Sequence, residues 1–175
     1  VVILALSTFI VKLASKIGKK ELSMIGCFIS AASFILLFII HTHNVWVWVG
    51  LIIVATIGTS MFNMVIWAMI TDVIDESEVQ TGVRQDGTIY SVYSFARKLG
   101  QACSSGLSGV LLSIIGYTSL TAFDPKVVDG IYNITCLVPA GGMILHLLAL
   151  RFLYPLNKKR VEENAEKLRI KRNEK

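Results

Sequence analysis

The chain alternates between long apolar stretches and short polar or charged connections. Apart from one Arg-Lys pair, the stretches at 22–40, 45–70, 88–115 and 131–150 carry no Asp, Glu, Lys or Arg, and a shorter apolar stretch fills 1–11. About 20 apolar residues in a helix cross a hydrocarbon core of about 30 Å, and period-two alternation typical of strands is absent. The pattern predicts an all-α, polytopic transmembrane bundle with four complete spans, and residues 1–11 as the end of a helix whose start is missing.

The composition supports a membrane protein. Hydrophobic residues make up 54% of the chain and charged residues 17%, with a mean hydropathy of +0.64. Soluble domains carry about 25% charged residues, so this apolar surplus is too large for one soluble core. The three cysteines lie in apolar stretches without metal-ligand spacing, and we expect neither a metal nor an organic cofactor.

Lysine and arginine cluster on alternate connections. The basic connections are 12–20, 71–87 and 151–175, whereas 41–44 and 116–130 hold one lysine between them. Basic residues favour the cytoplasmic side, so the three basic segments are predicted to be cytoplasmic, in a plasma-membrane protein.

The same charge pattern divides the chain into a transmembrane bundle, 1–156, and a basic cytoplasmic tail, 157–175. Eight of the 17 Lys and Arg residues fall within the last 18 positions. We interpret the tail as an orientation signal drawn to anionic membrane lipids. No nucleic-acid-binding motif accompanies these charges, and we expect no nucleic-acid partner.

The stretch 88–115 carries a polar stripe at helical spacing. Its members are Ser91, Ser94, Lys98, Gln101, Ser105 and Ser108. Lys98 falls near the middle of the predicted span, where a lysine costs about 2.5–3.5 kcal/mol, so it is expected to face a cavity. Lys98, Ser94 and Gln101 are therefore candidate substrate-binding residues, unless Lys98 forms a structural ion pair with a helix outside this chain. For the adjacent Arg97 we favour anchoring or snorkelling, within reach of Tyr90 and Tyr93.

A second polar face lies on the stretch 45–70. Thr56, Ser60, Asn63 and Trp67 follow steps of four, three and four and so share one side of a helix. An amide and an indole suit a sugar, which needs hydrogen bonds and an aromatic platform, and Asn63 and Trp67 are candidate sugar contacts. Polar contacts between helices are the alternative. His146 in the last stretch is left open between packing and a cavity role.

The segment 71–87 is predicted to be a charged loop. Its charged candidates are Asp72, Asp75, Glu78, Arg84 and Asp86. Charge pairs around Arg84 could latch and release a cytoplasmic gate at little net cost, although a solvated loop is the simpler alternative. No nucleophile or base is fixed beside these carboxylates, and we do not expect an enzyme.

These residues resemble a known family signature. The run DVIDESEVQTGVRQDGTIYSVYSFARKLGQ, and in particular Asp72, Thr81-Gly82-x-Arg84 and Lys98-x-Gly100, is similar to the segment between the tenth and eleventh helices of the glycoside–pentoside–hexuronide:cation symporters. Melibiose and glucuronide carriers belong to this branch of the major facilitator superfamily. The resemblance implies a twelve-helix fold of two bundles around a sugar site reached alternately from each side. It also implies that Lys98 lines the sugar and cation region and that the loop with Arg84 helps to close the inner side.

The resemblance predicts the carboxy-terminal portion of a sugar:cation symporter. Na⁺ or H⁺ would drive sugar or glycoside uptake, and the cation would be bound mainly by an amino-terminal bundle that is missing here and would complete the site. Two other classes stay open: a related facilitator that moves lipids, and a membrane scaffold or sensor that transports nothing.

Overall fold

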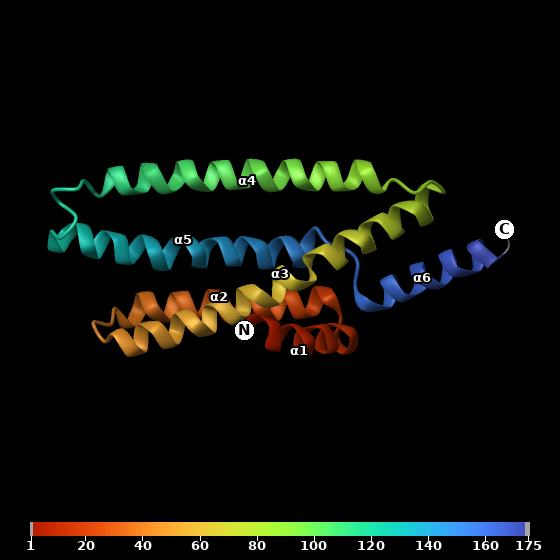
Figure 1. Ribbon diagram of the computed structural model, residues 1–175, viewed down its shortest axis with the longest axis horizontal. Helices are drawn as coiled ribbons and strands as arrows, with labels where there is room; N and C mark the ends of the chain where they lie inside the picture. Colours follow the sequence, from red (N-terminus) through yellow and green to blue (C-terminus); the bar gives the residue numbers. More distant parts are fainter. Residues whose placement is uncertain (1, 174–175) are drawn as a thin grey trace.

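The structure is a computed structural model. In the part of the chain that it describes, the regular elements are six helices joined by short connections. It describes the backbone of residues 2–173 and the side chains of residues 10–173. The helices are α1 (Val2–Ile17), α2 (Lys19–Ile40), α3 (Val45–Thr81), α4 (Asp86–Ile114), α5 (Pro125–Phe152) and α6 (Lys158–Asn173), drawn in Figure 1. The predicted all-α class is confirmed.

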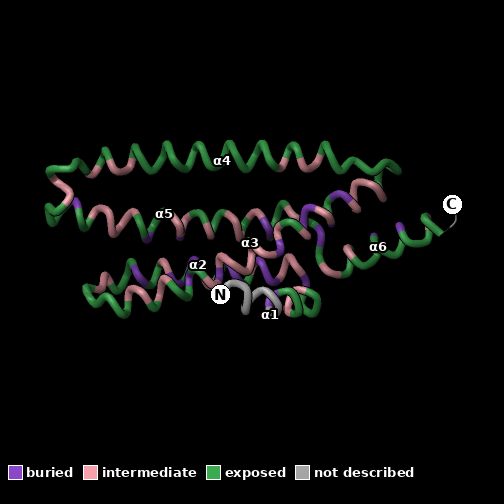
Figure 2. Tube along the Cα trace, viewed as in Figure 1, coloured by how far each residue is buried: buried purple, intermediate pink, exposed green. Residues whose placement is uncertain are grey.

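Helix α2 is the centre of the packing, because it lies against both α3 and α5. The core joins α1, α2, α3 and α5 through Ile10, Leu22, Cys27, Val65, Met69 and Leu150. Helix α4 stands apart from this core. None of its residues is buried, and its tube is exposed along most of its length in Figure 2.

Helix α3 is much longer than the predicted apolar span. It continues through residues 71–81, and only residues 82–85 remain as a connection to α4, so the loop expected at 71–87 is wrong in extent. Acidic side chains do not end a helix, whereas a residue with positive φ does. Gly82 supplies that residue, with φ 77°, and its N–H donates to the Glu78 carbonyl over 2.9 Å.

Two other predicted loops are also shorter than expected. Helix α1 runs to Ile17, so the loop at 12–20 is reduced to a break at Gly18. The loop at 116–130 ends where Pro125 opens α5, because proline is favoured in the first turn of a helix. The short connection 41–44 lies as predicted, with Asn44 capping α3 by accepting from the Trp46 N–H over 3.0 Å.

Three of the described helices, α2, α3 and α5, are long and apolar enough to cross a membrane. Helix α4 has 29 residues, about 43 Å at helical rise, and is therefore long enough. Its serines, Gln101 and the pair Arg97-Lys98 lower its hydropathy, so it is not among those three helices. The span predicted at 88–115 stays a prediction.

The close approach of α2 and α3 depends on two glycines that face each other. A Cβ added at Gly58 would lie 2.5 Å from the Gly26 carbonyl oxygen, and one at Gly26 would lie 2.5 Å from the Gly58 carbonyl oxygen. Small residues at such a crossing allow two backbones to pack directly in a membrane. Beside them, the Ser30 and Thr59 hydroxyls share a hydrogen bond of 3.0 Å between α2 and α3.

We expect Gly58→Ala to destabilise the protein. The added methyl group meets backbone and must push α2 and α3 apart, and overpacking of this kind costs about 1–3 kcal/mol. Gly50→Ala on the same helix is the control, because a Cβ there meets nothing within 4 Å. Thermal unfolding of the detergent-solubilised protein should show a Tm lowered by several degrees for Gly58→Ala alone. An equal Tm for both variants would contradict the close-packed crossing.

Candidate functional site

An open cavity of about 590 Å³ lies between α3, α4 and α5. Its lining comprises Phe62, Asn63, Ile66, Trp67, Tyr93, Ala96, Arg97 and His146. Within α3 the pairs Phe62–Ile66 and Asn63–Trp67 are each four positions apart, and within α4 Tyr93 is three and four positions before Ala96 and Arg97, so these residues share one side of their helix. The lining therefore combines an apolar wall with an amide, an imidazole, a phenol and a guanidinium group.

Trp67 is the centre of an aromatic cluster beside this cavity. The Tyr90 ring stacks on Trp67 with centroids 6.4 Å apart, and the Tyr93 ring meets it edge-on at 5.4 Å. The Arg97 Cζ atom lies over the indole, 5.8 Å from the ring centroid, in cation–π geometry. On α5, His146 meets Phe62 in an edge-on contact, with centroids 4.1 Å apart. The aromatic cluster thus orients Arg97 at the cavity wall.

The structure brings together only part of the predicted substrate set. Asn63 and Trp67 line the cavity, whereas Lys98, Ser94 and Gln101 are exposed on α4 and are not part of its lining. Lys98 lies about 100° around the helix from Arg97. No described residue forms an ion pair with it.

Arg97 lines the cavity, although the sequence favoured an anchoring role for it. A signal was available: Tyr90, Tyr93 and Arg97 follow steps of three and four on one helix face. That spacing pointed to the three residues acting together. The partner, Trp67 on α3, depends on how two helices pack and is not visible in a local pattern.

The predicted charge cluster around Arg84 forms at the end of α3. Its Nη1 atom lies 2.8 Å from Asp75 Oδ1 and 3.0 Å from Glu78 Oε2, and its Nε atom lies 2.9 Å from Asp86 Oδ2. These hydrogen bonds raise the pKa of Arg84 and lower the pKa of Glu78. One side chain thereby joins the last turns of α3 to the first turn of α4.

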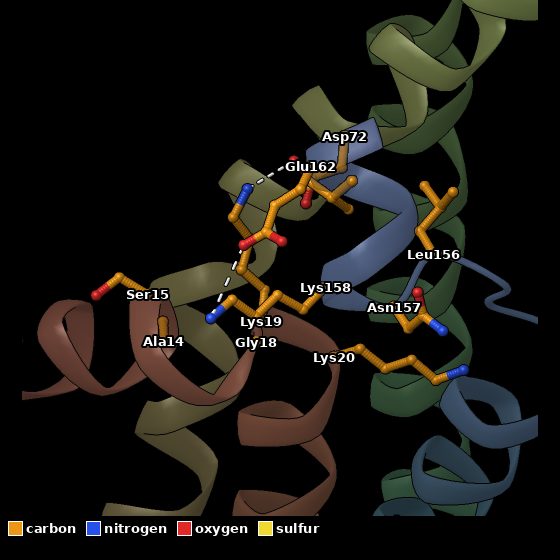
Figure 3. A pocket seen from close by; sticks show the side chains of 11 residues that line it. Ala14, Ser15, Gly18, Lys19, Lys20, Asp72, Leu156, Asn157, Lys158 and Glu162 are labelled. Atoms are coloured by element: carbon orange, nitrogen blue, oxygen red, sulfur yellow. Dashed lines mark hydrogen bonds and ion pairs between the residues drawn. The ribbon is translucent and has the colours of Figure 1, made fainter. Parts of the chain in front are cut away.

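Asp72 lies apart from that cluster. It is buried and accepts a hydrogen bond of 2.6 Å from Lys19 Nζ at the start of α2. Both residues line a small cavity of about 140 Å³ between α1, α2 and the beginning of α6, drawn in Figure 3. Lys158 of α6 reaches across to α1 and donates to the Lys16 carbonyl over 3.0 Å.

Helix α6 is held against the charged end of α3, the last turns of the helix that carry Glu76 and Glu78. Glu76 accepts hydrogen bonds from Arg160 and from Asn164, whose Nδ2 atom is 2.5 Å away. Further along, Arg172 lies 3.4 Å from Glu78. Glu76 was not among the residues predicted to have a role, because its partners on α6, Arg160 and Asn164, lie more than 80 positions away. The bond to Arg160 lowers the pKa of Glu76, which keeps this carboxylate charged.

Comparison with known proteins agrees with a membrane transporter. The family model described as "MFS/sugar transport protein" matches residues 1–158. The chain therefore belongs to the MFS/sugar transport protein family, and the resemblance inferred from the signature run is confirmed. No solved structure matches the chain.

The relatives that match the chain are named as symporters, carriers or importers. The chain is 38% identical to an uncharacterised symporter, YjmB, of Bacillus subtilis over 148 residues, which is 85% of this chain and 32% of the relative. It is 33% identical over 151 residues, 86% of this chain and 33% of the relative, to a glucuronide carrier protein homolog of Escherichia coli. A putative sulfoquinovose importer of Escherichia coli is 31% identical over 156 residues, 89% of this chain and 33% of that protein. The chain thus spans about a third of the length of these relatives.

We predict that Glu76→Gln loosens α6. The neutral amide loses the charge-assisted bonds from Arg160, and a loss of about 1–2 kcal/mol raises the undocked population about 5–30-fold. Limited trypsin digestion of the purified protein should then cut within α6 several-fold faster, because cleavage follows the undocked population. Glu166→Gln is the control, since within the described residues Glu166 pairs with Arg169 of α6 itself, 3.6 Å away, and with no residue of α3. Equal digestion of the two variants would show that Glu76 does not hold α6.

Proposed function

We propose that this chain forms part of a carrier that moves a sugar or glycoside across the plasma membrane. The observation that carries the proposal is the cavity between α3, α4 and α5, with Trp67 as platform and Asn63 and His146 as polar groups. Sugars combine C–H faces that stack on aromatic rings with hydroxyls that need donors and acceptors. The names of the relatives, a glucuronide carrier homolog and a putative sulfoquinovose importer, support the same substrate class.

In this proposal the carrier works by alternating access and couples uptake to Na⁺ or H⁺. Carriers of this kind bind substrate between two bundles, and the exposed length of α4 suits a helix that faces a second bundle. The rest of the carrier supplies that bundle and most of the cation site. Lys98 and the serine stripe of α4 belong to the wall of this pathway.

The charged end of α3 is the proposed cytoplasmic gate. Arg84 holds Asp75, Glu78 and Asp86 together, and exposed pairs of this kind exchange partners at little net cost. The basic segments 12–20 and 151–175, which flank the same end, agree with a cytoplasmic location. Asp72 pairs with Lys19 and thereby holds the carboxy-terminal part of α3 to the start of α2, beside the gate.

Uptake by the full-length carrier in proteoliposomes tests the proposal. Labelled glucoside and glucuronide should accumulate under an imposed Na⁺ or pH gradient, and an ionophore that collapses the gradient should stop accumulation. If a lipid competes and sugars do not, the carrier is a lipid facilitator; if nothing accumulates under any gradient, the protein is not a coupled carrier.

Substitution of the aromatic platform should weaken uptake. Trp67→Ala removes the ring on which the sugar stacks, and we expect the affinity to fall about tenfold. Trp46→Ala on the same helix is the matched control, because Trp46 is 83% exposed and lies outside the cavity. The measurement is the KM for labelled sugar in proteoliposomes. Equal KM values for the two variants would remove Trp67 from the substrate site.

A further inference from the structure

The carboxylate of Glu78 has two arginine partners, and they come from different parts of the chain. Nη1 of Arg84, in the connection between α3 and α4, lies 3.0 Å from Glu78 Oε2, and Nη2 of Arg172, on α6, lies 3.4 Å from the same oxygen. The hydrogen bond from Arg84, together with the charges of Arg172 and Lys171, lowers the pKa of Glu78. Glu78 therefore stays charged between a residue of the proposed gate and the last turn of α6.

Glu78 is the least exposed of the three carboxylates that Arg84 binds in the described part of the chain. Its side chain is 12% exposed, against 28% for Asp75 and 49% for Asp86. Water can hydrate the two more exposed carboxylates when Arg84 leaves, whereas a mostly buried carboxylate that loses its partner keeps most of its desolvation cost. The pair between Arg84 and Glu78 is therefore the costliest of the three to break.

The last turn of α6 is attached at the point where α3 ends. Lys171 Nζ donates to the Gly82 carbonyl oxygen over 3.1 Å, and Gly82 is the residue that caps α3. A cation is favoured at the carboxyl end of a helix, because the last carbonyl groups have no partner within that helix. At the beginning of α6, Arg160 pairs with Glu76. Neither attachment involves Arg84, so α6 holds Arg172 beside Glu78 independently of the gate.

From these contacts we infer that α6 regulates the proposed gate: docked α6 supplies Arg172 as a second partner for Glu78, so that Arg84 can leave without leaving that carboxylate unpaired. The two guanidinium groups also repel each other across one oxygen atom, which weakens the hold of Arg84 on Glu78. Docked α6 therefore favours the open gate. The inference rests on the proposed function and deepens it, because it names a residue of the tail that sets how readily the gate opens.

Labelling of a cavity residue from the cytoplasmic side measures how often the gate opens. Ala96, which lines the cavity between α3, α4 and α5, is replaced by cysteine in the full-length carrier. The carrier's other accessible cysteines, among them the exposed Cys103 of α4, are first replaced by serine. A membrane-impermeant thiol reagent is then added to inside-out vesicles, and the rate of labelling reports the population with an open gate.

Arg172→Gln should slow this labelling about two- to fivefold, because Glu78 is then left to Arg84 alone. Arg172→Lys keeps the positive charge and should give an intermediate rate, which guards against misfolding of the Gln variant. Arg169→Gln is the matched control, because Arg169 lies on the same helix, pairs with Glu166 of α6 and should leave the rate unchanged.

Arg84→Gln distinguishes failure of the inference from failure of the proposed gate. It removes the side chain that binds all three carboxylates and should accelerate labelling. If it does so while Arg172→Gln matches Arg169→Gln, the gate stands and its regulation by α6 is wrong. A faster rate for Arg172→Gln would also overturn the inference, because docked α6 would then hold the gate closed. If Arg84→Gln leaves the rate unchanged, the proposed gate and the inference fail together.

Discussion

A helix that carries an arginine and a lysine near its middle cannot turn them toward lipid, and this constraint governs the molecule. A charged side chain at the centre of a bilayer costs at least about 2.5–3.5 kcal/mol, so it must meet water, a ligand or protein. As the predicted span at 88–115, helix α4 would meet this constraint by dividing its surface. Val92, Phe95 and Leu99 gather on one side, whereas Arg97, the serine stripe and Lys98 occupy the other. Its polar side therefore needs an aqueous or protein neighbour.

The other helices pack around a core that includes no residue of α4. The glycine crossing and the core of α1, α2, α3 and α5 form a packed unit to which α4 contributes no buried residue. Among the described residues, the aromatic cluster around Trp67 and the Arg84 charge cluster both link α4 to α3. The proposed substrate site and the proposed gate coincide with these clusters, so a movement of α4 would alter both.

Periodicity in the sequence predicted the local elements, whereas contacts between distant elements could not be predicted from it. Apolar runs indicated the spans of α2, α3 and α5, and the Arg84 cluster was predicted because its members are neighbours in the chain. Charge was misread as a loop signal at 71–81, where only the positive φ of Gly82 ends the helix. The contacts of Arg97 with Trp67 and of Glu76 with Arg160 were not predicted, because the partners lie 30 and 84 positions away.

Cysteine accessibility along α4 of the full-length carrier tests the central claim most directly. Single cysteines replace Ser94, Gln101 and Ser108 on the polar side, and Phe95, Leu99 and Val110 on the opposite side, in the membrane-embedded protein. A membrane-impermeant, water-dependent thiol reagent should modify the first set readily and the second set hardly at all, because thiols ionise and react in water and not in lipid. Equal labelling of the two sets, or protection of both, would contradict a helix whose polar side lines an aqueous pathway.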